Sequence, residues 1–259
     1  MLSRNQIKYL GSLKIKKFRR THKQFLAEGD KIVRDIIHNN LADICQLVAT
    51  PAWLAANRLT ASPRIQEVIE AELTDISRIS SLETPPPVIA VLDMPEVRFS
   101  PEEVSSSLSM ALDTIQDPGN LGTIIRTADW FGIRNIFCNE ACADCYNPKV
   151  VQASMGAILH VGIYYVDLTE FLAGFSGKPD FTVYGTYMDG IPVTSVTPAK
   201  QGIIVFGNES RGISAEISPC IGQRLTIPPG TTEHGRVESL NVSSAVAIVL
   251  NTFMAIKTA

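Results

Sequence analysis

The chain has 259 residues, of which 45% are hydrophobic and 19% are charged. This composition supplies a sizeable core and excludes a disordered chain, a collagen-like repeat and a disulfide-stapled miniprotein. The longest apolar run covers residues 245–250, far below the roughly 18 residues that a membrane-spanning helix needs. Residues 1–20 contain no apolar stretch typical of an export signal, so we expect the five cysteines to be thiols of a cytoplasmic protein.

The net charge of −3 hides a strong polarity along the chain. Residues 1–34 hold ten Lys and Arg against two acids, a net charge of +8, whereas residues 35–110 carry −7 and residues 111–259 carry −4. A basic arm of this density suits an RNA backbone, because each neutralised phosphate releases condensed counterions. A solvated helix face is the alternative reading of the same charges. The candidate phosphate contacts are Lys14, Lys16, Lys17, Arg19, Arg20 and Lys23.

The first 95 residues predict a small α/β unit. Apolar residues at helical spacing predict helices over 30–38 and 65–73, and short apolar runs predict strands over 43–48 and 88–92. The next segment, 96–107, is polar, weakly patterned and punctuated by proline, which is typical of a linker. The remainder, 108–259, is then a second domain.

In that second domain short apolar strands alternate with helical patterns. We expect Asn120 to cap the first of these helices, and Asn147 followed by Pro148 to begin the second. Such alternation predicts a mostly parallel sheet covered by helices on both faces, with ligands beyond the carboxyl ends of the strands. The predicted strands are 110–112, 133–137, 161–166, 182–186, 203–206 and 224–227, and the predicted helices are 121–131, 148–159 and 242–256.

Several familiar chemistries are disfavoured by the motifs. Gly207 and Gly212 have the glycine spacing of a phosphate-binding loop, but Ile213 stands where that loop needs lysine. No G-x-G-x-x-G follows a strand, which removes the ordinary dinucleotide fingerprint. The four histidines are scattered and no G-x-S-x-G elbow is present, so hydrolase chemistry has no support.

The spacing of Cys138, Cys142 and Cys145 matches the cluster-binding motif of radical S-adenosylmethionine enzymes. However, Asp144 stands where those enzymes place an aromatic residue, and the rest of the chain is short for their barrel. A zinc site would need a fourth ligand, and no histidine is adjacent. We therefore expect ordinary thiols and no metal, and keep the radical enzyme as an alternative.

Three polar segments at predicted strand ends, taken in order, resemble the signature motifs of the SpoU (TrmH-like) family of SPOUT RNA methyltransferases. They are residues 120–128 (NLGTIIRTA), 205–212 (VFGNESRG), and 227–228 (IP) with 238–245 (ESLNVSSA). Residues 146–149 (YNPK) and 153–157 (ASMGA) are similar to the middle region of the family, so the resemblance covers about residues 109–257. Residues 25–29 (FLAEG) resemble, more loosely, the opening of the substrate-binding domain that precedes the catalytic domain in some members.

The resemblance implies an α/β sheet tied in a trefoil knot, preceded by a small α/β domain like RNA-binding ribosomal proteins. It further implies S-adenosylmethionine as cofactor, a homodimer with the active site near the subunit interface, and methyl transfer to a ribose 2′-hydroxyl. The two-domain layout favours structured large-subunit ribosomal RNA as the substrate over transfer RNA. A transfer RNA enzyme and a non-catalytic RNA-binding protein of the same fold remain the alternatives.

The family motifs also assign residues to roles. Arg126 occupies the catalytic centre, either as an unusual base or as a group that positions the phosphate and stabilises the developing alkoxide. The other catalytic candidates by resemblance are Asn120, Glu209, Ser239 and Asn241. The cofactor-binding candidates are Gly207, Asn208, Ile227, Pro228 and Leu240. Residues 229–237 form a longer loop than the family pattern, which puts the detail of cofactor binding in question.

Overall fold

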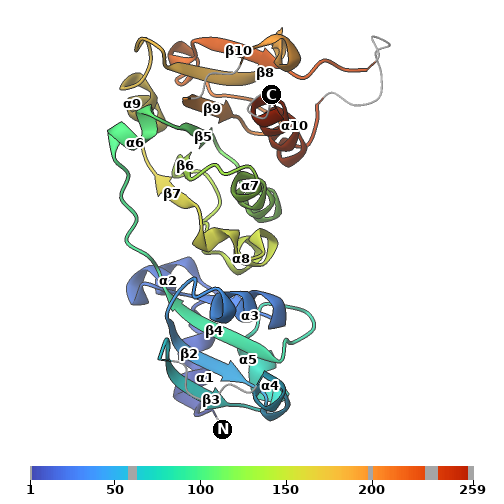
Figure 1. Cartoon of the computed structure of the whole chain (residues 1–259). Helices are drawn as coiled ribbons and strands as arrows, with labels where there is room; N and C mark the ends of the chain where they lie inside the picture. Colours follow the sequence, from blue (N-terminus) through green and yellow to red (C-terminus); the bar gives the residue numbers. More distant parts are fainter. Residues whose placement is uncertain (1, 58–62, 198–200, 231–238, 256–259) are drawn as a thin grey trace. The chain divides into compact units, whose positions relative to one another are not determined.

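The computed structural model describes residues 2–57, 63–197, 201–230 and 239–255, and the chain divides into two compact units (Figure 1). Unit 1 comprises Met1–Glu96 together with Asp144–His160, and unit 2 comprises Val97–Ala143 together with Val161–Ala259. The linker predicted over 96–107 coincides with only one of the places where the chain passes from one unit to the other. The segment Asp144–His160 lies inside the predicted second domain in sequence but packs with the first.

Unit 1 is built on a four-stranded sheet with the order β1-β4-β2-β3. Strand β4 pairs antiparallel with both β1 and β2, and β3 pairs parallel with β2. The elements of unit 1 are α1 (Arg4–Ser12), α2 (Lys16–His22), β1 (Gln24–Glu28), α3 (Asp30–His38), β2 (Ile44–Ala49), α4 (Pro51–Asn57), β3 (Ile65–Glu70), α5 (Leu73–Ile79), β4 (Val88–Asp93), α8 (Pro148–Ser154) and the 3₁₀ turn Ala157–Leu159.

The sequence predictions for unit 1 are confirmed where the apolar pattern is strong. Helix α3 spans the predicted residues, and β2 and β4 coincide with the predicted strands. The helix predicted over 65–73 is wrong, because Ile65–Glu70 is an edge strand and the helix that follows begins at Leu73. Pairing with β2 overrides the local pattern, since β3 buries little of its own surface.

Unit 2 contains a six-stranded sheet with the order β10-β8-β9-β5-β6-β7, and each of these neighbouring strands pairs parallel with the next. The predicted mostly parallel sheet is thus confirmed. The elements of unit 2 are α6 (Pro101–Ser105), β5 (Leu108–Leu112), α7 (Pro118–Trp130), β6 (Asn135–Cys138), β7 (Gly162–Tyr165), α9 (Leu168–Ala173), β8 (Thr182–Pro192), β9 (Gly202–Phe206), β10 (Gln223–Thr226), α10 (Val242–Ala255) and the 3₁₀ turns Val193–Ser195 and Ser218–Cys220.

Helices cover both faces of this sheet, as the alternating pattern predicts. Strands β5 and β9 at its centre are buried along their whole length. On one face, Val104 of α6 and Leu172 of α9 pack in one cluster with Phe137 and Val205. Helices α7 and α10 lie side by side, and Phe253 of α10 meets the ring of Tyr184 (Figure 1). The short helices α6 and α9 are not among the predicted elements.

Two sequence expectations concern the chain beyond single elements. No helix in the described parts of the chain is long and apolar enough to cross a membrane. The predicted knot depends on the path between β9 and α10, which includes residues 231–238, outside the described residues, so the knot remains a prediction.

A buried carboxylate lies at the end of strand β1 in unit 1. Glu28, at the end of β1, is 4% exposed and accepts hydrogen bonds from the hydroxyls of Ser80 and Ser81, each at 2.6 Å. The backbone N–H of Ser81 also donates to this carboxylate, at 3.0 Å to the nearer oxygen. A buried charge is tolerated only when hydrogen bonds replace its hydration, and here three donors do so.

We expect the Glu28→Ala variant to lower the free energy of unfolding by about 2–4 kcal/mol, because the buried hydroxyl of Ser80 and the two donors of Ser81 lose their acceptor. Glu72, an exposed residue before α5 whose side chain makes no capping hydrogen bond, supplies the control. Its replacement by alanine should change the free energy within about 0.5 kcal/mol in the same urea titration. Equal effects of the two substitutions would contradict the structural role of Glu28.

Candidate functional site

Asn120 brings the three sequence motifs together in unit 2. Its amide nitrogen donates to the Glu209 carboxylate at 2.6 Å, and its amide oxygen accepts from the Asn241 side chain at 3.0 Å. Asn120 belongs to the first motif, Glu209 to the second and Asn241 to the third. Residues separated by 89 and 121 positions therefore meet at a single amide.

The start of α7 presents this amide. Asp117 is the N-cap, accepting a hydrogen bond from the backbone N–H of Asn120 at 2.8 Å, and Pro118 occupies the first helical turn. The expectation that Asn120 itself caps the helix is wrong, because the helix begins two residues earlier. The consequence is functional: the Asn120 side chain is released from capping and bonds to the other motifs. The second predicted start is confirmed, with Asn147 capping α8 before Pro148.

A second polar network ties together the ends of the adjacent strands β5, β6 and β9. Asp113, 1% exposed, accepts from the Asn139 amide at 2.7 Å, the Ser214 backbone N–H at 2.7 Å and the Thr114 hydroxyl at 2.9 Å. The Asn208 amide donates to the Thr114 carbonyl at 2.9 Å. The loop after β9 is thereby tied, at Asn208 and at Ser214, to the two residues that follow β5.

The motif resemblance does not single out Asp113, Asn139 or Ser214. The available signal is positional, since Asp113 and Asn139 each directly follow a buried strand. Polar residues at carboxyl ends of neighbouring parallel strands meet at one edge of the sheet. That rule, applied after the strands are known, would have placed Asp113 and Asn139 together.

The loop after β9 is closed on itself. Asn208 and Gly212 exchange two backbone hydrogen bonds of 3.0 and 2.8 Å, and the Asn208 side chain accepts from the backbone N–H groups of Ser210 and Arg211. At Gly207 a Cβ atom would come within 2.2 Å of the Gly212 carbonyl carbon, so only glycine fits. Position 207 therefore requires a residue without a side chain.

The remaining cofactor candidates lie at the ends of β10 and before α10. Ile227 is partly exposed, Pro228 is exposed and Leu240 is 48% exposed. Three apolar residues left open to solvent could pack against a flat aromatic ring such as adenine. Of the longer loop predicted over 229–237, residues 231–237 lie outside the described part of the chain.

Arg126 is exposed on α7 and makes no hydrogen bond or ion pair with any residue that the structure describes. The Glu209 carboxylate accepts a hydrogen bond from Asn120. Ser239 is exposed, two residues before Asn241. The structure thus joins Asn120, Glu209 and Asn241 and leaves Arg126 open to solvent.

All five cysteines are buried thiols outside any disulfide bond. Cys142 donates to the Leu112 carbonyl and accepts from the Ile115 backbone N–H, so it packs beside the Asp113 network. A hydrogen bond with Cys138 lowers the pKa of Cys142, and the Ile115 N–H acts in the same direction against burial. Among the described residues, no group of three His, Cys, Asp or Glu could hold a metal ion.

The basic arm lies in unit 1, and its members differ in how they can be used. Lys17 is exposed and Lys16 partly exposed, whereas the ammonium of Lys14 donates to the carbonyls of Arg78 and Ser80 at 3.3 and 3.1 Å. Lys23 lies 3.7 Å from Glu96 in a solvated ion pair, which contributes little to stability. Arg20 is exposed, and it too has an interaction of its own.

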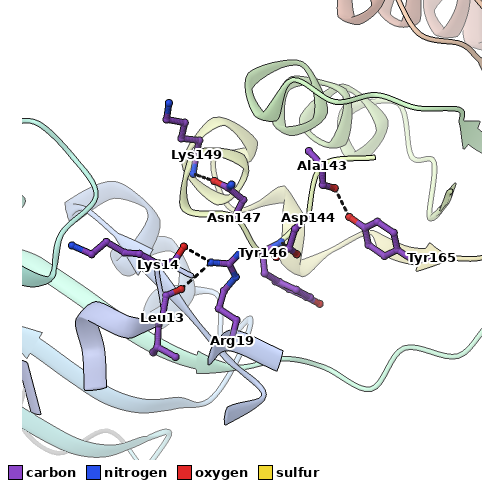
Figure 2. A network of polar contacts seen from close by, with 9 residues as sticks. All are labelled: Leu13, Lys14, Arg19, Ala143, Asp144, Tyr146, Asn147, Lys149 and Tyr165. Carbon is purple, nitrogen blue, oxygen red and sulfur yellow. Dashed lines mark hydrogen bonds and ion pairs between the residues drawn. The ribbon is translucent and has the colours of Figure 1, made fainter. Parts of the chain in front are cut away.

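The prediction that Arg19 contacts RNA phosphates is wrong. Its side chain is 2% exposed, and its guanidinium donates to the carbonyls of Leu13 and Lys14 and lies 2.5 Å from the Asp144 carboxylate (Figure 2). Charge alone cannot distinguish it from its neighbours, but burial removes it from the surface. Arg19 is therefore an internal anchor and not a phosphate contact.

Replacement of Asp113 by alanine should lower the free energy of unfolding by about 2–4 kcal/mol, because three donors lose one acceptor. It should also speed amide hydrogen exchange in the segment that contains Ser214, measured by mass spectrometry. Ser109 is the matched control, since it lies on β5, which Asp113 follows, is 0% exposed and has a hydroxyl without a partner in the described part of the chain. If the Ser109→Ala and Asp113→Ala variants show the same rates of amide hydrogen exchange in the loop after β9, the Asp113 network does not hold that loop.

Comparison with known proteins gives two family matches. Residues 107–251 match the SpoU rRNA Methylase family, and residues 4–90 match the MRM3-like substrate binding domain. The 23S rRNA (guanosine(2553)-2′-O)-methyltransferase RlmP of Bacillus subtilis is 30% identical over 175 residues, which cover 67% of each chain.

Solved structures agree over nearly the whole chain. A candidate RNA methyltransferase of the TrmH family from Porphyromonas gingivalis is 40% identical, with a TM-score of 0.86 and 99% of both chains covered. An AdoMet-bound rRNA methyltransferase from Sinorhizobium meliloti is 28% identical, with a TM-score of 0.81, covering 99% of this chain and 96% of that one. With the three motifs joined at Asn120, these matches show that the chain belongs to the SpoU rRNA methylase family.

Proposed function

We propose that this protein transfers a methyl group from S-adenosylmethionine to a ribose 2′-hydroxyl of structured RNA, with large-subunit ribosomal RNA as the favoured substrate. The observation that carries the proposal is the pair of hydrogen bonds by which Asn120 joins Glu209 and Asn241. Family membership supports the reaction class, and the RlmP relative supports ribosomal RNA and the 2′-oxygen. The AdoMet-bound relative from Sinorhizobium meliloti supports the cofactor.

The cofactor site would use main-chain atoms and open apolar side chains. Gly207 is partly exposed and carries no side chain of its own, and the loop from Asn208 to Gly212 is preorganised by its own hydrogen bonds. Ile227, Pro228 and the half-exposed Leu240 would pack against the adenine ring. Because an adenine edge needs few donors and acceptors and the ring needs apolar cover, this set of residues fits the cofactor.

The chemistry requires a poor nucleophile to be aligned and its charge stabilised. When bound, the cofactor supplies a methyl group on a positively charged sulfur. The residues of the site would align the ribose 2′-hydroxyl with that methyl group, and the hydroxyl proton would pass to solvent water as the methyl group is transferred. Arg126, with its guanidinium free of carboxylate partners in the described chain, would hold the adjacent phosphate and stabilise the developing alkoxide. Asn120, Glu209, Ser239 and Asn241 would shape and order the pocket.

We assign the units to the two tasks by the same reasoning. Residues 1–95 would bind RNA, 96–107 would link the domains, and 108–259 would carry catalysis. The surface lysines of the arm supply the electrostatic attraction that a chain of net charge −3 lacks on average. The family match of residues 4–90 to a substrate-binding domain supports this division.

A homodimer and a cytoplasmic site complete the proposal. Trp130 at the end of α7 is 84% exposed and Ile248 on α10 is 40% exposed, although the two helices pack against each other. A second copy of the chain covering α7 and α10 would bury these side chains. The cytoplasm is where ribosomal RNA would meet the enzyme.

The experiment that tests the function is incubation of the purified full chain with total RNA and radiolabelled S-adenosylmethionine, followed by mapping of ribose methyl groups. We expect label in large-subunit ribosomal RNA. Label in transfer RNA alone would support the transfer RNA alternative, and absence of transfer would favour a non-catalytic RNA-binding protein. A colourless, iron-free preparation would exclude the radical enzyme.

For catalysis, we expect Arg126→Ala to lower kcat by at least about 100-fold, because a positioned donor to the developing oxyanion is lost. Cofactor Kd, measured by calorimetry, should change less than about threefold. Arg134, exposed at the amino end of β6, is the matched arginine control and should tolerate alanine with full activity. Full activity of both variants would remove Arg126 from the mechanism.

For RNA binding, Lys17→Ala should reduce the slope of log Kd against log salt by about 0.7–0.9, the contribution of one phosphate contact. Lys31→Ala removes the same charge from the exposed side of α3 and controls for net charge. We measure both slopes by fluorescence anisotropy on one ribosomal RNA fragment. Identical slopes would mean that Lys17 belongs to a solvated face.

A further inference from the structure

Helix α2 and the residue before it present an apolar and aromatic stripe at the surface of unit 1. Ile15 is 55% exposed and Phe18 is 37% exposed, within the most basic part of the chain. His22 follows Phe18 by one helical turn, so the two rings lie on one side of the helix. The ring of Tyr9 meets that of His22 edge-on, with centroids 5.0 Å apart.

The buried Arg19 fixes this stripe in place. Its bonds to the carbonyls of Leu13 and Lys14, at 2.9 and 2.7 Å, hold the turn that leads into α2. Its ion pair with Asp144, at 2.5 Å, attaches the same turn to the Asp144–His160 segment of unit 1 (Figure 2). A surface held by a buried side chain loses little conformational entropy when a ligand binds.

Cations stand beside the stripe. Lys17 is the neighbour of Phe18 on an adjoining face of the helix and is exposed, and Lys16 is partly exposed. A polyanion is therefore the ligand that matches the surface in charge. Phosphate contacts do not involve an exposed aromatic ring. Unstacked bases of RNA do, since proteins commonly stack such bases on aromatic side chains.

We propose that Phe18 stacks on an unpaired nucleobase of the RNA substrate while Lys17 and Lys16 contact the neighbouring phosphates. The inference rests on the proposed RNA methyl transfer and narrows its substrate to RNA whose segment on unit 1 is single-stranded. In a duplex the base faces are covered by their neighbours and cannot reach the ring. Stacking accepts any base, so this contact selects an unpaired strand and not a sequence.

The test compares one fluorescein-labelled RNA of about 12 nucleotides, single-stranded or annealed to its complement, by fluorescence anisotropy with the full chain. Phe18→Ala should weaken single-strand binding about five- to a hundredfold. Binding to the duplex should stay within twofold, and the salt slope should not change. Phe18→Leu, which keeps an apolar side chain without a ring, should weaken single-strand binding as well. Leu73→Ala, at a residue 48% exposed elsewhere in unit 1, is the control and should bind as wild type.

Phe18→Trp supplies a readout that a purely structural role would not give. We expect it to keep single-strand affinity, and its added indole emission to be quenched by the single strand and not by the duplex. Unchanged single-strand binding of Phe18→Ala, or equal losses on both RNA forms, would overturn the stacking contact. If wild type binds neither RNA form, the failure lies with the proposed RNA-binding role of unit 1.

Discussion

One buried carboxylate holds the functional edge of unit 2 together. Parallel pairing of β9, β5 and β6 brings the carboxyl ends of three strands to one edge, but each strand then continues into a separate loop. Asp113 accepts from Asn139 in one of these loops and from Ser214 in another. The loop that carries Glu209 is thus fixed at both of its ends, by Asn208 near its start and Ser214 after it. The hydrogen bond between Asn120 and Glu209 depends on this fixed position of the loop.

The arginines of the chain illustrate how one residue type serves opposite purposes. Arg19 is buried, with two carbonyls and a carboxylate around its guanidinium, and stabilises unit 1. Arg126 is exposed without such partners among the described residues, which leaves its donors for a ligand. A buried guanidinium costs desolvation that only well-placed acceptors offset, and an open one keeps its hydration until substrate displaces it. Burial, not charge, separates the anchor from the candidate catalyst.

The sequence predicts well what short-range patterns determine. The central strands β5 and β9 read as continuous apolar runs because helices cover both of their faces, and α8 shows its start as Asn147 followed by Pro148. It predicts poorly what distant partners determine. Strand β3 exists because β2 pairs with it, and Arg19 is buried because Asp144, 125 residues away, receives it. The Asp113 network is of the second kind, so no motif could show it.

The choice of partner for Glu209 has a consequence for the mechanism. If its carboxylate paired with Arg126, it would neutralise the guanidinium and compete with any phosphate for the same donors. Asn120 instead supplies the neutral donor that Glu209 needs. Its amide oxygen in turn accepts a hydrogen bond from Asn241, so these three side chains satisfy one another. An arginine left out of this network can respond to the negative charge that the proposed reaction would develop on the ribose oxygen.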